Sequence, residues 1–168
     1  PNLGPNVLSA WLGCPLQFAE TTTWVEPIVR RPEDYAALHF DRNGRWWKWM
    51  REMTALCARR GKGRFITGMT DLHGGGDALA GLRGTEALCA DLVEAPQAVK
   101  AAERTVQRTW VEVTEELYGL IAAEGQVGCG GFLGWAPGRS WPLQDDLFAL
   151  ISPKMARSVS APAAAAAL

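Results

Sequence analysis

The apolar positions of the chain fall into segments with helical spacing and segments with strand-like composition. Helical spacing is clearest in residues 45–61, where one stripe holds Trp46, Met50, Met53 and Cys57. A longer helical pattern begins at Pro96 and continues to Gly125, with its apolar residues on one face. These two segments are predicted to be the main helices.

Shorter helices are predicted elsewhere from capping residues and apolar spacing. One covers residues 3–13, and a helical turn begins at Pro32. Asp77 is predicted to cap a helix that carries four leucines, and Ser152 with Pro153 begins a last one. The four leucines are Leu79, Leu82, Leu88 and Leu92.

Three segments are predicted to be extended because they are apolar or β-branched and lie next to proline or glycine. They are residues 21–29, 63–70 and 127–135, and residues 141–150 are expected to extend or turn. Strands alternating with helices are typical of α/β units on a parallel sheet. We therefore expect an α/β fold of about three β/α units, either part of a (β/α)8 TIM-barrel-like structure or a small open sheet.

Composition narrows the functional classes. The chain has 168 residues, 48% hydrophobic and 21% charged, as expected for one globular domain. Its formal net charge of −1 provides no overall attraction for nucleic acid or for an anionic membrane. The four cysteines lie far apart without a CxxC pair, which favours a reducing cytoplasm over a zinc knuckle or a disulfide scaffold.

The ends of the chain differ from the rest. The sequence starts at Pro1 and finishes in an alanine-rich stretch with no amphipathic pattern. We expect a domain over residues 1–155, a low-complexity tail over residues 156–168, and a longer parent protein. No apolar segment reaches the length of about 20 residues that a transmembrane helix needs.

The stretch TDLHGGGD, residues 70–77, follows a predicted strand, where α/β enzymes place functional loops. It lacks the spacing of a phosphate-binding loop, and two metal ligands without a third make a weak metal site. Asp71 and His73 are candidates for acid–base chemistry. A structural role, in which they form hydrogen bonds with the loop backbone, has equal weight. For Asp77, helix capping is the favoured interpretation.

Three further features have a functional and a structural interpretation. For the paired aspartates in LQDDLF, residues 143–148, the functional interpretation is that they share a proton or orient a cationic group. The structural interpretation is an exposed turn. Arg83 binds a substrate carboxylate or forms a salt bridge to Glu86 or Asp91, and the salt bridge is favoured. The tryptophans of residues 46–49 are predicted to be core and interface residues rather than a stacking platform.

Two longer stretches resemble the uroporphyrinogen decarboxylase superfamily, especially its less characterised bacterial members. They read ITGMTDLHGGGDALAGLRGTEALCADLVEAPQAV and GWAPGRSWPLQDDLFALISPKM, and the similarity covers roughly residues 1–155. The resemblance implies a (β/α)8 barrel with a cleft at its mouth. It also implies cofactor-free decarboxylation of a carboxylated substrate, tetrapyrroles included, or in relatives methyl transfer to a corrinoid with a zinc-bound thiol.

The resemblance also implies roles for particular residues. The expected catalytic residues are Asp71, His73 and Asp146, and the expected substrate-binding residues are Arg83, Asp77, Gln144 and Trp135. No metal is expected, since zinc and a corrinoid enter only with the methyltransferase alternative.

The expected partner is a small carboxylated substrate. Binding to nucleic acid or to a membrane is not expected, and the expected assembly, if any, is a homodimer. The family continues past ISPKM with an aromatic-rich helix, so a truncation or frame change near Met155 is expected. A non-catalytic binding module and an inactive truncated product remain the alternatives to an enzyme.

Overall fold

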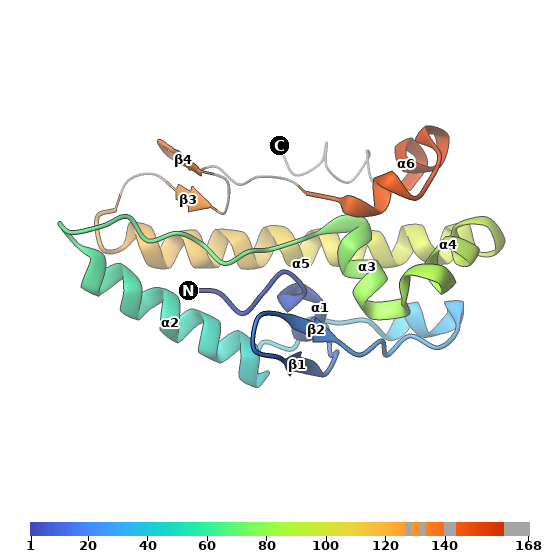
Figure 1. Cartoon of the computed structure of the whole chain (residues 1–168), viewed down its shortest axis with the longest axis horizontal. Helices are drawn as coiled ribbons and strands as arrows, with labels where there is room; N and C mark the ends of the chain where they lie inside the picture. Colours follow the sequence, from blue (N-terminus) through green and yellow to red (C-terminus); the bar gives the residue numbers. More distant parts are fainter. Residues whose placement is uncertain (127–128, 132–133, 140–143, 160–168) are drawn as a thin grey trace.

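A computed structural model of the chain describes residues 1–126, 129–131, 134–139 and 144–159, and these are mostly helical (Figure 1). The α-helices are α1 (Val7–Trp11), α2 (Arg45–Gly61), α3 (Gly75–Arg83), α4 (Thr85–Glu94), α5 (Pro96–Ala122) and α6 (Pro153–Val159). Two 3-10 helices are η1 (Pro32–Ala37) and η2 (Asp146–Ala149). The short strands are β1 (Leu16–Phe18), β2 (Thr23–Val25), β3 (Cys129–Gly131) and β4 (Gly134–Ala136).

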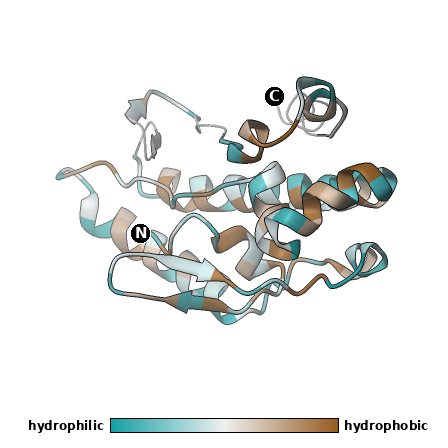
Figure 2. Cartoon of the chain, turned by 45° about the vertical axis from the view of Figure 1, so that its right-hand side comes forward, coloured by the Kyte–Doolittle hydropathy of each residue, from teal (hydrophilic) through white to brown (hydrophobic). Residues whose placement is uncertain are grey.

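The long helix α5 is the central element of the core. It begins with Pro96 in its first turn, where a missing N–H costs no hydrogen bond. Its apolar stripe packs against α2, α3, α4 and η1, and hydrophobic and hydrophilic residues take different faces of the helices (Figure 2). The fully buried residues of that stripe are Val99, Val106, Val113, Leu117 and Ile121.

The predicted α/β fold, with part of a TIM-like barrel, is wrong. In the described part of the chain the strands form two separate antiparallel pairs, β1 with β2 and β3 with β4. Residues 63–70 form no strand, although Gly68 makes a single bridge. Of the predicted strand 127–135, residues 127–128 and 132–133 lie outside the described residues.

The physical reason is visible in the segment between α2 and α3. A strand of a parallel sheet is buried on both faces, but Phe65 and Ile66 are 52% and 50% exposed. This segment instead runs alongside α5 (Figure 1) and is held there by side chains. Gln126 accepts a hydrogen bond from the Thr67 N–H, and the Trp110 indole donates one to the Leu72 carbonyl. The surface of α5 thus takes the place that a sheet was expected to occupy.

Several helix predictions are confirmed, and one is corrected. The helix over residues 45–61 and the helix starts at Pro96 and Pro153 are as expected. The single helix predicted after Asp77 is divided into α3 and α4 at Gly84, whose φ of 90° is unfavourable for other residues. Asp77 is not the cap of α3, because Gly74 holds that position and Asp77 lies within the first turn.

Two other expectations concern the ends of the chain and membranes. Most of the predicted alanine-rich tail, residues 160–168, lies outside the described residues. Among the residues that are described, none of the helices combines the length and the apolar character needed to cross a bilayer.

Candidate functional site

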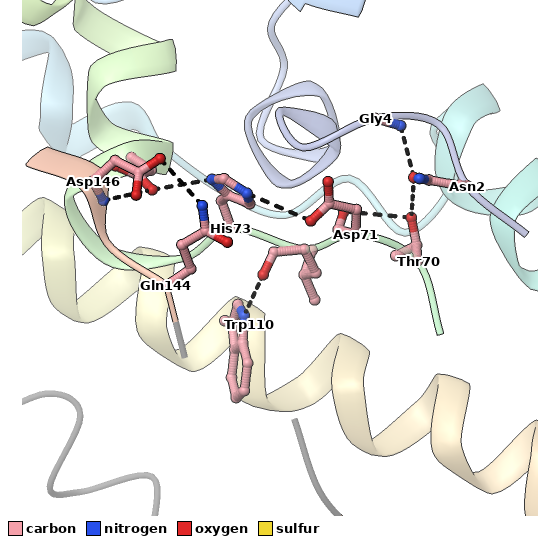
Figure 3. A network of polar contacts seen from close by, with 10 residues as sticks. Asn2, Gly4, Thr70, Asp71, His73, Trp110, Gln144 and Asp146 are labelled. Atoms are coloured by element: carbon pink, nitrogen blue, oxygen red, sulfur yellow. Dashed lines mark hydrogen bonds and ion pairs between the residues drawn. The ribbon is translucent and has the colours of Figure 1, made fainter. Parts of the chain in front are cut away.

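The loop before α3 holds a histidine between two carboxylates. His73 Nδ1 lies 3.0 Å from Asp77 Oδ2, and His73 Nε2 lies 3.4 Å from Asp71 Oδ1. The three side chains are largely buried, with exposed fractions of 13–17%. Figure 3 shows the imidazole ring between Asp71 and the chain around Asp146. The structure therefore brings together two of the three predicted catalytic residues, with the third beside them.

Neighbouring elements keep this loop in place. Thr70, just before it, is buried and donates a hydrogen bond to the Asn2 side chain over 3.2 Å. The Trp110 indole of α5 donates to the Leu72 carbonyl over 3.3 Å, and Leu72 itself is buried. The residues on both sides of Asp71 are thus fixed to the N-terminus and to α5, which limits the positions that the His73 ring can take.

The two acidic loops predicted from the sequence meet through reciprocal hydrogen bonds. Asp77 accepts the N–H groups of Asp146 and Leu147, each over 3.0 Å, and so caps η2 rather than its own helix. In return, Asp145 accepts the Gly76 N–H over 3.0 Å. A Cβ at Gly76 would lie 2.5 Å from the Leu147 side chain, so this approach requires glycine.

The charges around His73 favour its protonated form. The hydrogen bond with Asp77 raises the pKa of His73, burial opposes this increase, and the negative charge of Asp71 adds to it. Burial alone would raise the pKa of Asp77. The hydrogen bonds from His73 and from the N–H groups of Asp146 and Leu147 outweigh burial, so the pKa of Asp77 is lowered. The pair is therefore an imidazolium and a carboxylate over a wider pH range than free side chains would be.

His73 and Asp77 also line an open cavity of about 350 Å³ between α3, β2 and the start of α1. Asn6 and Thr85 supply its other polar side chains. The remaining lining is apolar or glycine: Pro5, Trp24, Val25, Pro27, Ala80 and Gly81. Sequence reasoning did not single out Asn6, Trp24 or Thr85, because they come from separate elements and no spacing pattern links them.

Arg83 does not line this cavity. Its Nε and Nη2 atoms donate to the two oxygens of Asp91 over 2.7 and 3.2 Å, and Nη1 donates to the Arg30 carbonyl over 2.7 Å. The Tyr35 hydroxyl donates to the same Asp91 carboxylate over 3.1 Å. These contacts are those of the salt-bridge alternative, and they tie α3 and α4 to η1.

The other predicted substrate-binding residues lie in different surroundings. Gln144 donates a hydrogen bond to Asp146 Oδ2 over 3.1 Å and so belongs to the His73 neighbourhood (Figure 3). Trp135 is on β4, is 54% exposed, and is not part of the cavity lining. Trp47 is buried as expected for a core residue, whereas Trp49 is 46% exposed.

His73, Asp77 and Asp146 also form a potential metal-binding group. Each offers one ligand atom, and these atoms lie within 4.8 Å of one another. Nitrogen from histidine and oxygen from carboxylates suit zinc and manganese. The sequence offered only two of these ligands in one loop, and the docking of η2 on α3 supplies the third.

No protein-family model, curated protein or solved structure matches this chain. The function is therefore inferred from the site itself, together with the resemblance noted in the sequence.

Proposed function

We propose that the chain carries an acid–base site in which His73 donates a proton to a small carboxylated substrate. The observation that carries the proposal is the imidazole held between Asp71 and Asp77 at the wall of a cavity. A general acid must have a suitable pKa and lie where its substrate can reach it. The proposed activity is that of a uroporphyrinogen decarboxylase-like lyase, in agreement with the resemblance.

In the proposed reaction the bond between the substrate carbon and its carboxyl group breaks and releases CO₂. The electron pair remains on that carbon, which then takes a proton from the imidazolium of His73. The Nε2 proton is the one assigned to this transfer, because its contact with Asp71 is longer than the contact of Nδ1 with Asp77. Asp77 holds the ring in position and stabilises its positive charge.

The cavity favours a small substrate over a tetrapyrrole. Its volume of about 350 Å³ lies near the lower end of the range for small-molecule sites, roughly 300–1,000 Å³. His73 is the cation in its lining, since Arg83 is bound to Asp91. The substrate carboxylate would be held by the imidazolium, Asn6 and Thr85, and its carbon skeleton would lie against Trp24 and Val25.

The proposal includes a cytoplasmic location. Cys14, Cys57 and Cys89 are free thiols in the structure. Free cysteines are usual in a reducing compartment.

The proton donor is tested with the two histidines of the chain, His39 and His73. The imidazole signals are followed by NMR during a pH titration, and His39→Gln assigns them. We expect Asp71→Asn to lower the pKa of His73, because it removes one of the negative charges that raise it. An unchanged titration would contradict the role of Asp71.

Activity is tested by CO₂ release from a panel of small carboxylic acids. His73→Gln should abolish release, and His39→Gln should leave it intact, since His39 is exposed and distant in sequence. Release that survives His73→Gln would refute the acid–base proposal. Binding that raises the melting temperature without any turnover would favour the non-catalytic module instead.

The second candidate function is binding of a divalent metal ion, favoured by the spacing of His73, Asp77 and Asp146. A bound divalent ion would supply Lewis acidity at this site. These three ligands include no thiol, so they do not match the zinc-bound thiol of the methyltransferase alternative. An ion would compete with the hydrogen bonds that Asp77 already accepts from η2. Calorimetry with Zn²⁺ and Mn²⁺ distinguishes the two functions, because Asp146→Asn should weaken metal binding whereas Asp71→Asn should not.

A further inference from the structure

The outward face of α2 combines positive charge with exposed apolar side chains. Residues 45–66 contain seven basic residues and one acidic residue, Glu52. We define the α2 surface by the exposed charged and large apolar residues of this segment, which are Arg45, Lys48, Trp49, Arg51, Glu52, Leu56, Arg59, Arg60, Lys62, Arg64, Phe65 and Ile66. The net charge of −1 for the whole chain conceals this local excess.

Most of these positive charges are not neutralised by ion pairs. Arg51 pairs with Glu116 of α5, and Arg45 lies over the rings of Trp46 and Trp49 at 4.7 and 5.1 Å. Within the described residues, Lys48, Arg59, Arg60, Lys62 and Arg64 have no ion-pair partner. This surface therefore carries a net positive charge, with Glu52 as its one acidic residue, and it complements an anionic partner.

The apolar side chains of the surface are about half exposed. Trp49 and Leu56 are each 46% exposed and lie seven residues apart, so they share one face of the helix. Beyond the end of the helix at Gly61, Phe65 and Ile66 are exposed to a similar extent. Trp46 packs between Trp49 and Phe18, with ring centroids 5.7 and 5.3 Å apart, which orders the aromatic end of this surface.

We propose that the α2 surface binds an anionic lipid bilayer from one side. A basic helix with tryptophan and leucine on its exposed face lies in the membrane interface, where aromatic rings and apolar tips enter the headgroup region. A nucleic acid or an acidic peptide would satisfy the arginines, but it offers no apolar interior for Leu56 and Ile66. The apolar exposure is therefore the observation that favours a bilayer.

The proposal goes beyond the proposed activity and does not depend on it. The residues of the α2 surface are absent from the cavity that His73 lines. Loss of CO₂ release by His73→Gln and loss of membrane binding are thus separate outcomes.

Binding is measured by sedimentation of the full chain with vesicles. The protein should sediment with phosphatidylcholine vesicles that contain phosphatidylglycerol, but not with pure phosphatidylcholine vesicles. Added salt should return it to the supernatant. The double variant Arg59→Gln/Arg60→Gln should weaken binding roughly 25-fold, since each basic residue near an anionic surface contributes about fivefold. Leu56→Ser should weaken it several-fold without a change in charge.

A matched control removes two arginines elsewhere. Arg104→Gln/Arg108→Gln changes the net charge equally at exposed positions of α5 and should retain vesicle binding. Circular dichroism and thermal melting check that each variant is folded. Equal binding to both vesicle types, no binding, or equal losses in the two double variants would overturn the proposal. Binding to double-stranded DNA without binding to vesicles would assign the surface to a polyanion instead.

Discussion

Glu103 allows a sharp test of how burial affects stability in this fold. The residue lies on α5, is 2% exposed, and faces the negative charge of Asp145. Burial first, and Asp145 second, raise the pKa of Glu103 from 4.5 to about 7, while Arg104 lowers it slightly. The folded protein therefore holds a proton on Glu103 at pH values where the unfolded chain has released it.

The sign of the effect follows from this difference in proton binding. As the pH rises from 4.5 towards about 7, Glu103 contributes progressively less to stability, and above that range the fold contains a buried carboxylate. The full shift corresponds to about 3 kcal/mol. Glu103→Gln keeps the size of the side chain but cannot ionise, so it should stabilise the protein by about 3 kcal/mol near pH 8 and by about 1 kcal/mol near pH 5.

Urea unfolding followed by tryptophan fluorescence measures both values. The other titrating groups are shared by the two proteins, so the difference between them isolates Glu103. Glu94→Gln, at an exposed position on α4, is the control and should have little effect at either pH. A gain that does not change with pH, or a loss of stability at both values, would show that Glu103 is not a buried carboxylate as described.

Three further substitutions probe contacts around the site. Arg83→Met leaves the buried Asp91 carboxylate without its cation and should lower the free energy of unfolding by about 3 kcal/mol, measured by urea denaturation. Trp110→Phe removes the hydrogen bond to the Leu72 carbonyl and should cost about 1 kcal/mol, with faster amide exchange in the His73 loop. Gly84→Ala places a side chain at a φ of 90° and should cost about 1–3 kcal/mol, seen as a lower melting temperature. A wild-type melting temperature for Gly84→Ala would contradict the backbone assigned between α3 and α4.

The site shows how local and tertiary information combine. The acid, histidine and glycines of residues 70–77 are enough to indicate the loop with Asp71 and His73 as a candidate site. Its contact with Asp146 depends on η2 docking on α3, and the residues concerned are 69 and 70 positions apart in the sequence. Whether Arg83 binds a substrate carboxylate or pairs with Asp91 likewise depends on where the fold places α4, which carries Asp91.

Sequence by itself determined the two long helices and the start of the last one, because their signals are local. The apolar spacing of residues 45–61 and the prolines at 96 and 153 act through neighbouring residues and are visible without a fold. Tertiary structure decided the rest. A short apolar run such as residues 63–70 has the same composition whether it enters a sheet or lies along a helix, and only its packing on α5 excluded the predicted barrel. The cavity, the carboxylates around His73 and the exposed charge of α2 also depend on how separate elements pack together. The spacing of residues along the chain does not encode that packing.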